Sequence, residues 1–301
     1  MEIKQLEIFL SVARNLSFSK AAEEMYISQP SVSTQINALE KILGSQLFIR
    51  NTKEVSLTKT GLGFLVYVQK ILSVRDQALQ NVCGKDRNAN GVIDIISSTI
   101  PAQFLLPEII ASFQTEWPNI VFRVEQADSH RVGREMNSFR YDFGLVGTIP
   151  DNGRFKFSSV YDDELVLILS NSAEQNSKDI RENFADFIRQ SPFIMRETGS
   201  GTRKEIETLF MKIGVEPRNL RVPAYFSDAL SILQSVSCGM GVSLISKVAA
   251  KMYVDAGTLK MIEMDSPLFR RQIYLLHNKE LWLSPTQQAF ADHAQKYFKS
   301  R

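Results

Sequence analysis

The sequence predicts a mixed α/β protein with two unlike parts: a small helical part at the N-terminus and a larger part of alternating strands and helices. Three observations support this prediction. Apolar residues recur at helical spacing through the first 43 residues, and a short hairpin-like segment follows. A single long helical pattern comes next. From Gly91 onward, short apolar runs alternate with helical patterns, and the total length of 301 residues suits two or three folding units.

Three short helices are expected first. Ser17 and Ser28 can cap the second and third helices, Pro30 fits a first helical turn, and Gly44 ends the third helix. The apolar stripe of the first helix consists of Leu6, Phe9, Leu10 and Ala13. Two short helices joined by a three-residue turn predict a helix-turn-helix unit.

A hairpin and a long helix follow Gly44. Residues 47–49 and 55–57 are expected to form two short strands around a turn at 51–54, which is a wing. Thr58 then caps a helix that runs to about Val82. The spacing of its apolar residues predicts pairing with a helix of a second copy. These residues are Leu65, Val68, Leu72, Leu79 and Val82. The polar stretch 84–91 is expected to be a hinge.

The third helix carries the candidate DNA-contact residues. Its buried stripe is expected to be Val32, Ile36 and Leu39, and no charged residue occurs from Met25 to Leu39. An uncharged face of amides and hydroxyls can enter the major groove without carboxylate repulsion, whereas basic wing residues suit phosphates. The expected DNA-contact residues are Gln29, Pro30, Ser33, Thr34 and Asn37 on the helix, with Arg50 and Lys53 on the wing. The alternative is that these polar residues only solvate a small helical bundle.

Composition excludes few function classes. The chain is 44% hydrophobic and 23% charged, and its net charge of +2 is too small to mark a nucleic-acid-binding protein. Cys83 and Cys238 lie far apart and form no pair motif, which fits a reducing compartment. No secretory signal and no membrane-spanning apolar run are evident, so a cytoplasmic protein is expected.

Residues 9–61 resemble the signature of the LysR-type transcriptional regulators. The matching positions are Ser17-Phe18, Ala21-Ala22, Ser28-Gln29-Pro30-Ser31-Val32-Ser33, Ile36, Leu39-Glu40, Gly44, Leu47-Phe48, Arg50 and Leu57-Thr58. The resemblance implies that Gln29, Pro30, Ser33 and Thr34 face DNA, with Arg50 and Lys53 on the wing. The family often has a basic residue where this chain has Thr34 or Asn37, and arginine where it has Lys53; these departures bear on which DNA sequence is read.

The second half resembles the effector domain of the same family in the segments SSTIPAQFLLPEIIASFQTEWPNIVFRV, YDFGLVG and SVSCGMGVSLIS. The resemblance implies a periplasmic-binding-protein-like pair of α/β lobes with a small ligand between them. The expected division is a DNA-binding domain at 1–57, a dimerising linker helix at 58–87 and an effector domain at 91–301. Within that domain, lobe I would comprise 91–163 and 266–301, and lobe II 164–265.

Candidate effector residues lie where strands are expected to meet helices. Hydroxyls and unpaired N–H groups converge at such helix N-termini, which favours an anion, and glycines in RETGSGTR allow close backbone approach. The expected effector-binding residues are Ser98, Thr99, Thr148, Ser200, Thr202, Phe226 and Ser227. Arg196 or Arg203 can add a charge-assisted bond. The alternative is that these serines and threonines are plain helix caps.

Catalysis finds little support in the sequence. His130, His277 and His293 are scattered without metal-ligand spacing, and nucleophile-elbow, Walker and dinucleotide motifs are absent, so neither metal nor cofactor is expected. The expected function is regulation of transcription. The expected partners are an imperfect inverted repeat of double-stranded DNA, a small effector, further copies of the chain as a dimer or tetramer, and RNA polymerase. A solute-binding protein with a helical appendage and an enzyme are the alternatives.

Overall fold

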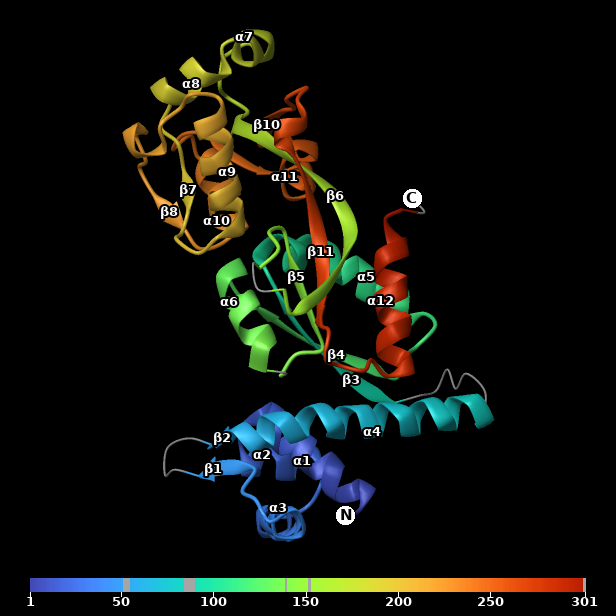
Figure 1. The fold of residues 1–301 in the computed structure, drawn as a ribbon. Helices are drawn as coiled ribbons and strands as arrows, with labels where there is room; N and C mark the ends of the chain where they lie inside the picture. Colours follow the sequence, from blue (N-terminus) through green and yellow to red (C-terminus); the bar gives the residue numbers. More distant parts are fainter. Residues whose placement is uncertain (51–54, 84–89, 139, 151–152, 300–301) are drawn as a thin grey trace.

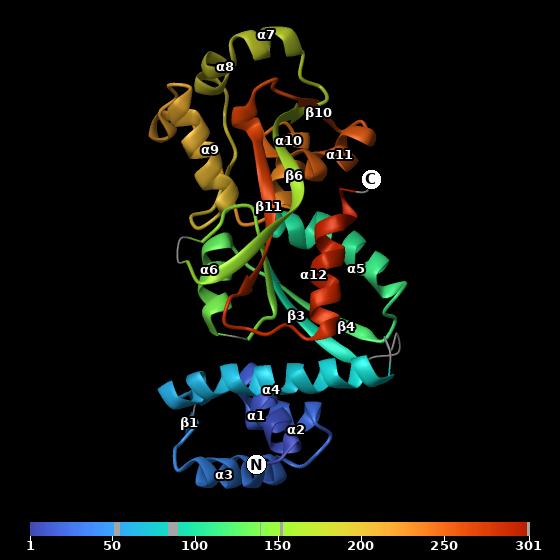
Figure 2. The same ribbon diagram turned by 45° about the vertical axis from the view of Figure 1, so that its right-hand side comes forward.

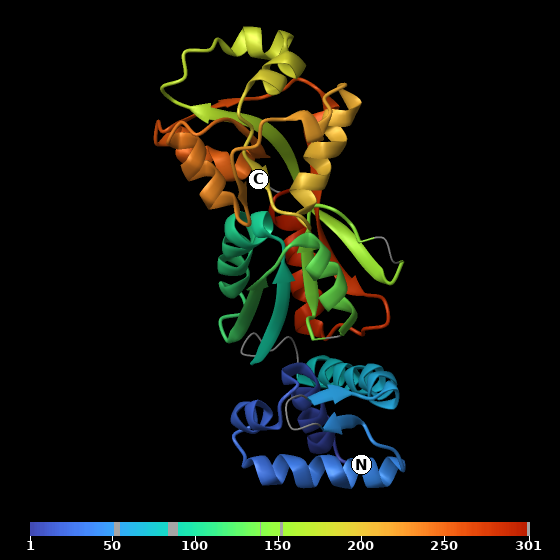
Figure 3. The same cartoon turned by 90° about the vertical axis from the view of Figure 1, so that its left-hand side faces the viewer.

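The computed structural model describes residues 1–50, 55–83, 90–138, 140–150 and 153–299. Three parts follow one another along the molecule (Figures 1 and 3): a head formed by the N-terminal helices and hairpin, then lobe I, then lobe II. The long helix α4 (Lys59–Cys83) lies between the head and lobe I. No described helix is long and apolar enough to cross a membrane.

The head has the helices and hairpin that the sequence predicts: α1 (Ile3–Asn15), α2 (Phe18–Glu24), α3 (Gln29–Leu43), β1 (Phe48–Arg50) and β2 (Val55–Leu57). The predicted caps are confirmed, since the Ser17 hydroxyl accepts from the Lys20 N–H and the Ser28 hydroxyl from the Ser31 N–H. The two strands are antiparallel, with Phe48 opposite Leu57. The Thr58 hydroxyl accepts from the N–H of Gly61, 2.9 Å away, and so caps α4.

The apolar stripe of α4 corrects one prediction. Leu65, Val68 and Leu72 are buried in the core of their own head, packed with residues of α1, α3 and the hairpin. The expectation that they face a second copy is therefore wrong. The side chains of residues 80–83, and the predicted wing turn and hinge at 51–54 and 84–89, lie outside the described residues.

Lobe I is a sheet covered on both faces. Its strands β3 (Gly91–Ser97), β4 (Ile120–Gln126) and β5 (Phe143–Val146) are parallel, with β3 in the middle. Alternate β3 residues point to opposite faces: Ile95 packs with the helices α5 (Leu106–Gln114) and α12 (Pro285–Tyr297), and Ile96 packs with α6 (Ser129–Glu135). Figure 2 shows α5 and α12 side by side on the sheet. The short helical turns η1 (Pro101–Leu105) and η2 (Met136–Ser138) adjoin α5 and α6.

Lobe II is built around the far half of β6 (Phe155–Ser170). That half pairs with β9 (Ser243–Ser246) and β10 (Leu259–Ile262), while β7 (Met195–Arg196) and β8 (Tyr225–Phe226) form a separate parallel pair. The helices of this lobe are α7 (Ser177–Glu182), α8 (Phe184–Gln190), α9 (Gly201–Lys212), α10 (Ala229–Ser237) and α11 (Lys247–Asp255), with the turns η3 (Pro217–Asn219) and η4 (Pro267–Phe269).

Two strands join the lobes and make the seven-stranded sheet partly antiparallel. β6 leaves lobe I for lobe II, and β11 (Arg270–Asn278) returns, so the two run in opposite directions and pair from Glu164–Arg270 to Phe155–Asn278. The seven-stranded order is β10-β6-β11-β5-β3-β4, with β9 also on β6. Only residues 165–169 of β6 form an uninterrupted apolar run, because Asp162, Asp163 and Glu164 precede them.

Candidate functional site

The outer face of α3 is open. Gln29, Pro30, Thr34 and Asn37 are exposed and Ser33 is half-buried, while Val32, Ile36 and Leu39 on the opposite face are buried as predicted. α3 lies at the end of the molecule remote from both lobes (Figure 3). The predicted helix residues therefore share one surface, which no described part of the chain covers.

Arg50 joins the wing to α3. Its Nη2 donates to Asn37 Oδ1 at 2.7 Å and lies 3.4 Å from Glu40 Oε2. Its guanidinium also stacks over the ring of Phe18, 4.5 Å from the centroid. Because these contacts fix its direction, Arg50 is held beside the exposed face of α3. Lys53 lies outside the described residues.

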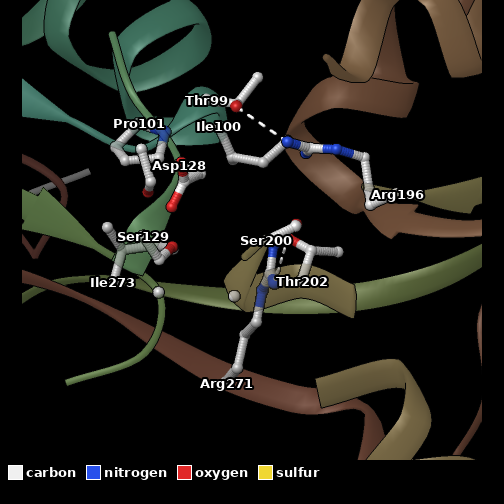
Figure 4. Close-up of a pocket in the computed structure, with 13 residues that line it drawn as sticks. Thr99, Ile100, Pro101, Asp128, Ser129, Arg196, Ser200, Thr202, Arg271 and Ile273 are labelled. Carbon is white, nitrogen blue, oxygen red and sulfur yellow. Dashed lines mark hydrogen bonds between the residues drawn. The ribbon is translucent and has the colours of Figure 1, made fainter. Parts of the chain in front are cut away.

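A small pocket lies between the lobes (Figure 4). It encloses about 10 Å³, which is the space of roughly one water molecule. Lobe I contributes residues at the carboxyl ends of its three parallel strands, and lobe II contributes Arg196 and the start of α9. The polar residues that line it are Ser98, Thr99, Asp128, Ser129, Arg196, Ser200, Thr202 and Arg271.

The structure brings together four of the seven predicted effector residues: Ser98, Thr99, Ser200 and Thr202. The others lie apart from the lining. Thr148 adjoins it and donates its hydroxyl to Glu205 Oε1 at 3.0 Å. Phe226 packs on the apolar core of lobe II, and Ser227 is exposed and contributes only its carbonyl oxygen, which accepts from Arg196. The last two therefore do not face the enclosed space.

Sequence reasoning missed three polar residues of the pocket. Asp128 follows β4 and caps α6 by accepting from the Arg131 N–H, and Ser129 is the first residue of that helix. They follow the strand-to-helix rule that identified the other candidates and were therefore detectable. Arg271 lies within β11, and no local pattern distinguishes it from the neighbouring Arg270.

Arg271 is a buried cation with an incomplete set of partners. Its Nε donates to Asp163 at 2.7 Å, and its Nη1 donates to Glu205 at 2.6 Å and to Thr202 at 3.1 Å. Burial alone would lower its pKa, but the carboxylates of Asp163 and Glu205 outweigh burial and raise it, so the guanidinium stays charged. Its Nη2 is buried and has no hydrogen-bond partner among the described residues.

Beside the pocket, two polar contacts bridge the lobes in addition to the hydrogen bonds from Arg271 to Thr202 and Glu205. Arg196, on β7 of lobe II, donates through Nη2 to the hydroxyl of Thr99 in lobe I at 3.1 Å (Figure 4). Its Nε donates to Glu197 at 2.9 Å. Glu205 of α9 provides the second bridge through Thr148. Side-chain hydrogen bonds therefore hold the two lobes together at the pocket and next to it.

Among the described residues, no cluster of three or more histidine, cysteine, aspartate or glutamate side chains is placed to hold a metal ion.

Comparison with protein families gives two matches that cover nearly the whole chain. Residues 3–62 match the model of the bacterial regulatory helix-turn-helix proteins of the lysR family, and residues 86–299 match the LysR substrate-binding domain. The chain belongs to the LysR family. It is thus a transcription regulator with a DNA-binding helix-turn-helix and an effector-binding domain of two α/β lobes.

Individual relatives agree with this LysR assignment. An uncharacterised HTH-type transcriptional regulator of Methanocaldococcus jannaschii is 30% identical, and the match covers 92% of this chain and 93% of that protein. The RuBisCO operon transcriptional regulator of Allochromatium vinosum is 29% identical over 97% of this chain and 95% of its own length.

Solved LysR-type structures share the fold. Full-length OxyR of Pseudomonas aeruginosa superposes with a TM-score of 0.71 at 18% identity, covering 98% of this chain and 95% of that one. The effector-binding domain of QuiR in complex with shikimate superposes with a TM-score of 0.59 at 21% identity, covering 71% of this chain and 99% of the domain.

Proposed function

We propose that this LysR regulator is a cytoplasmic protein controlled by a small effector that carries an anionic oxygen group, bound in the pocket between the lobes. The observation that carries the proposal is the Nη2 group of Arg271, which is buried at the pocket without a partner among the described residues. A buried N–H without an acceptor costs about 1–3 kcal/mol, so a ligand oxygen there recovers that energy.

The start of α9 supports the same anionic group. Ser200 caps this twelve-residue helix, and Gly201 and Thr202 of its first turn line the pocket. The N–H groups at a helix N-terminus have partial positive charge and favour an anion. Arg271 and α9 thus offer donors to one oxygen group from two directions.

Asp128 narrows the ligand class. Its carboxylate, between β4 and α6 of lobe I, lines the pocket on the side that faces lobe II (Figure 4). A second anionic group of the ligand would be repelled there. A hydroxyl or ammonium group is favoured there, so the proposed effector is a small hydroxy acid, amino acid or similarly mixed molecule. The QuiR domain, which has the same fold, is in complex with shikimate, a hydroxylated carboxylic acid.

The volume of the pocket implies a change of shape on binding. Because about 10 Å³ is too small for such a molecule, the lobes must separate and the Arg196–Thr99 hydrogen bond must open before the ligand enters. The ligand then shifts the balance between lobe positions according to how much better it binds one of them.

On the DNA side, we propose that Gln29, Pro30, Ser33, Thr34 and Asn37 contact base edges. Arg50 and Lys53 contact phosphates on each half of an imperfect inverted repeat. The proposed assembly is a dimer or tetramer that acts with RNA polymerase. Tyr67, Ile71 and Val74 support the pairing, since all three are exposed apolar residues along one side of α4. The proposed boundaries are 1–57, 58–87 and 91–301, with lobe I at 91–163 and 266–301 and lobe II at 164–265.

Calorimetry on the purified full chain tests the effector class. The panel contains small hydroxy acids, amino acids, sulfate and phosphate, each beside a neutral amide or ester of similar size where one exists. We expect binding by acids and none by their neutral analogues. Binding that is confined to neutral or apolar compounds would refute the anionic effector, and sequencing of the genomic fragments that the protein retains tests the DNA side separately.

A further inference from the structure

The end of α1 in the head reaches lobe I through one arginine. Arg14 Nη2 lies 2.7 Å from Asp142 Oδ1, and Nη1 lies 3.4 Å from Asp94 Oδ2. Asp94 lies within β3, and Asp142 comes directly before β5. The other oxygen of Asp142 accepts from the backbone N–H of Asp94 at 2.9 Å, so both carboxylates are fixed to the sheet.

A second ion pair joins the same two parts. Glu24, at the end of α2, accepts from Arg123 of β4 at 2.9 Å. The Ser11 hydroxyl and the Asn15 amide hold this carboxylate at 2.6 and 2.8 Å. Arg123 also lies 3.9 Å from Asp94. Arg14, Glu24, Asp94, Arg123 and Asp142 therefore form one network, here called the head latch.

Apolar packing contributes little to this junction. The apolar core of the head contains only residues of the head and α4, and none of the described apolar clusters of the lobes includes a head residue. A cavity of about 720 Å³ lies between α1, α4 and lobe I. Two polar contacts join α4 to lobe I beside this cavity. The Ser73 hydroxyl donates to the Leu283 carbonyl, and the Lys70 ammonium lies over the Trp282 ring. Charged and polar contacts therefore set how the head sits on lobe I.

The strands of the latch lead to the effector pocket. β3 carries Asp94 and ends beside Ser98, while β4 carries Arg123 and ends beside Asp128. β5 follows Asp142 and ends beside Gly147. All three are parallel, and β4 and β5 are both hydrogen-bonded to β3, which lies between them. The latch thus lies near the middle of β3 and β4 and directly before β5, and the pocket lies at the carboxyl ends of the same three strands.

We propose that the head latch makes the head and lobe I one rigid body, so that movement of lobe I on effector binding repositions the DNA-binding helix α3. This inference rests on the proposed effector site for the source of the movement. The latch does not cover the exposed face of α3, so it holds the head in place without blocking DNA. When the latch is broken, the head can adopt many orientations on lobe I. DNA binding then has to select one of them, which lowers the affinity.

A double-mutant cycle on the full-length protein tests the latch. The variants are Arg14→Gln, Asp142→Asn and the two together. Arg189→Gln is the matched control, because Arg189 forms an exposed ion pair with Asp186 in lobe II. The first measurement is hydrogen exchange of the amides of α1 and β3, which requires neither DNA nor effector. We expect faster exchange in each single variant, no further increase in the double variant, and no change in the control.

The second measurement is affinity for a genomic fragment that the wild-type protein retains. We expect the affinity of Arg14→Gln to fall about tenfold, with a smaller response to any effector, and the double variant to fall no further. If Asp142→Asn fails to fold, Arg123→Gln replaces it in the cycle, because this variant removes the half-exposed ion pair between Arg123 and Glu24. Unchanged exchange, additive effects or tighter DNA binding would overturn the latch. Failure of wild-type protein to retain any DNA would instead overturn the DNA side of the proposed function, and the exchange cycle would still decide the latch.

Discussion

Arg271 and Asp163 lie directly opposite each other on the two antiparallel strands that connect the lobes, with Nε and Oδ2 2.7 Å apart. Both side chains are buried, at 7% and 0% exposure. The Ser246 hydroxyl donates to the other carboxylate oxygen of Asp163, Oδ1, at 2.6 Å. Because every movement between the lobes passes through these strands, this ion pair lies at the hinge. The same arginine lines the pocket, so the proposed effector site and the connection between the lobes share one side chain.

Arg271→Gln should destabilise the protein and abolish the effector response. The change leaves the buried Asp163 carboxylate and the half-buried Glu205 carboxylate without their cation, and removing one partner of a buried pair costs about 3–5 kcal/mol. Urea unfolding measures the decrease in stability. Arg270→Gln is the matched control, because Arg270 is the exposed neighbour on the same strand. Equal stability of the two variants would contradict the role given to Arg271.

Gly201→Ala should weaken effector binding while basal DNA binding persists. A Cβ at this position would lie 2.6 Å from Ser129 Oγ and 3.0 Å from Thr148 Oγ1, both in lobe I. The methyl group therefore fills space at the pocket lining where the ligand is proposed to bind, and overpacking there costs about 1–3 kcal/mol. Calorimetry with the acids that bind the wild-type chain measures the effect. Gly63→Ala is the control, because a Cβ there meets open space.

Ser33→Ala and Gln29→Ala should each weaken sequence-specific DNA binding by about 1–3 kcal/mol, because each change removes a polar group that we propose contacts a base edge. Both residues lie on the uncharged face of α3, and the Gln29 amide donates to the Ser33 hydroxyl at 3.2 Å, so their effects should be coupled. Fluorescence anisotropy on a selected fragment and on a scrambled one measures the preference. Ser112→Ala in α5 of lobe I is the control. A variant with wild-type affinity and preference would remove that residue from base readout.

Ile71→Glu should produce monomers without unfolding the head, since Ile71 is exposed on the proposed pairing side of α4. Leu72→Glu should instead unfold the head, because Leu72 packs in the core with α1. Sedimentation and circular dichroism on the two neighbouring variants separate assembly from folding. A wild-type chain that sediments as a monomer at micromolar concentration would contradict the assembly.

Acid should weaken the latch through Glu24. Burial raises the pKa of this carboxyl, but hydrogen bonds from Ser11, Arg123 and Asn15 outweigh burial, and the net pKa lies below its ordinary value. A lowered folded-state pKa contributes stability above the unfolded value, and that stability is lost as the pH falls through the folded value. The melting temperature of Glu24→Gln should therefore fall less steeply than that of wild type below about pH 5. Parallel curves would refute this.

The melting temperature of Glu24→Gln is compared with that of wild type because Asp94 and Asp142 also titrate in acid. Burial raises the pKa of these two carboxyls, so their protonation favours the folded state as the pH falls, which is the opposite of the effect of Glu24. Glu23→Gln is the control, because Glu23 is the neighbour of Glu24 on α2 and belongs to no part of the latch.

The sequence by itself determined the features that depend on near neighbours. Helix caps such as Ser28 and Gly44, the buried stripe of α3 and its uncharged outer face all follow from residues within one or two helical turns of each other. Short, mainly apolar segments such as 143–146 and 259–262 are also local signals, and they coincide with the strands β5 and β10. These local preferences act before the chain folds, so they are visible in the order of residues.

Only the tertiary structure decided which distant residues meet. Arg271 pairs with Asp163 from 108 positions away, and Arg14 pairs with Asp142 from 128 positions away. Neither pairing leaves a periodic trace, because an ion pair needs only two charges brought together by the packing of whole elements. The partner of the Leu72 stripe was undetermined for the same reason: apolar spacing shows that a face is buried, but whether α1 or a second chain covers it depends on the fold.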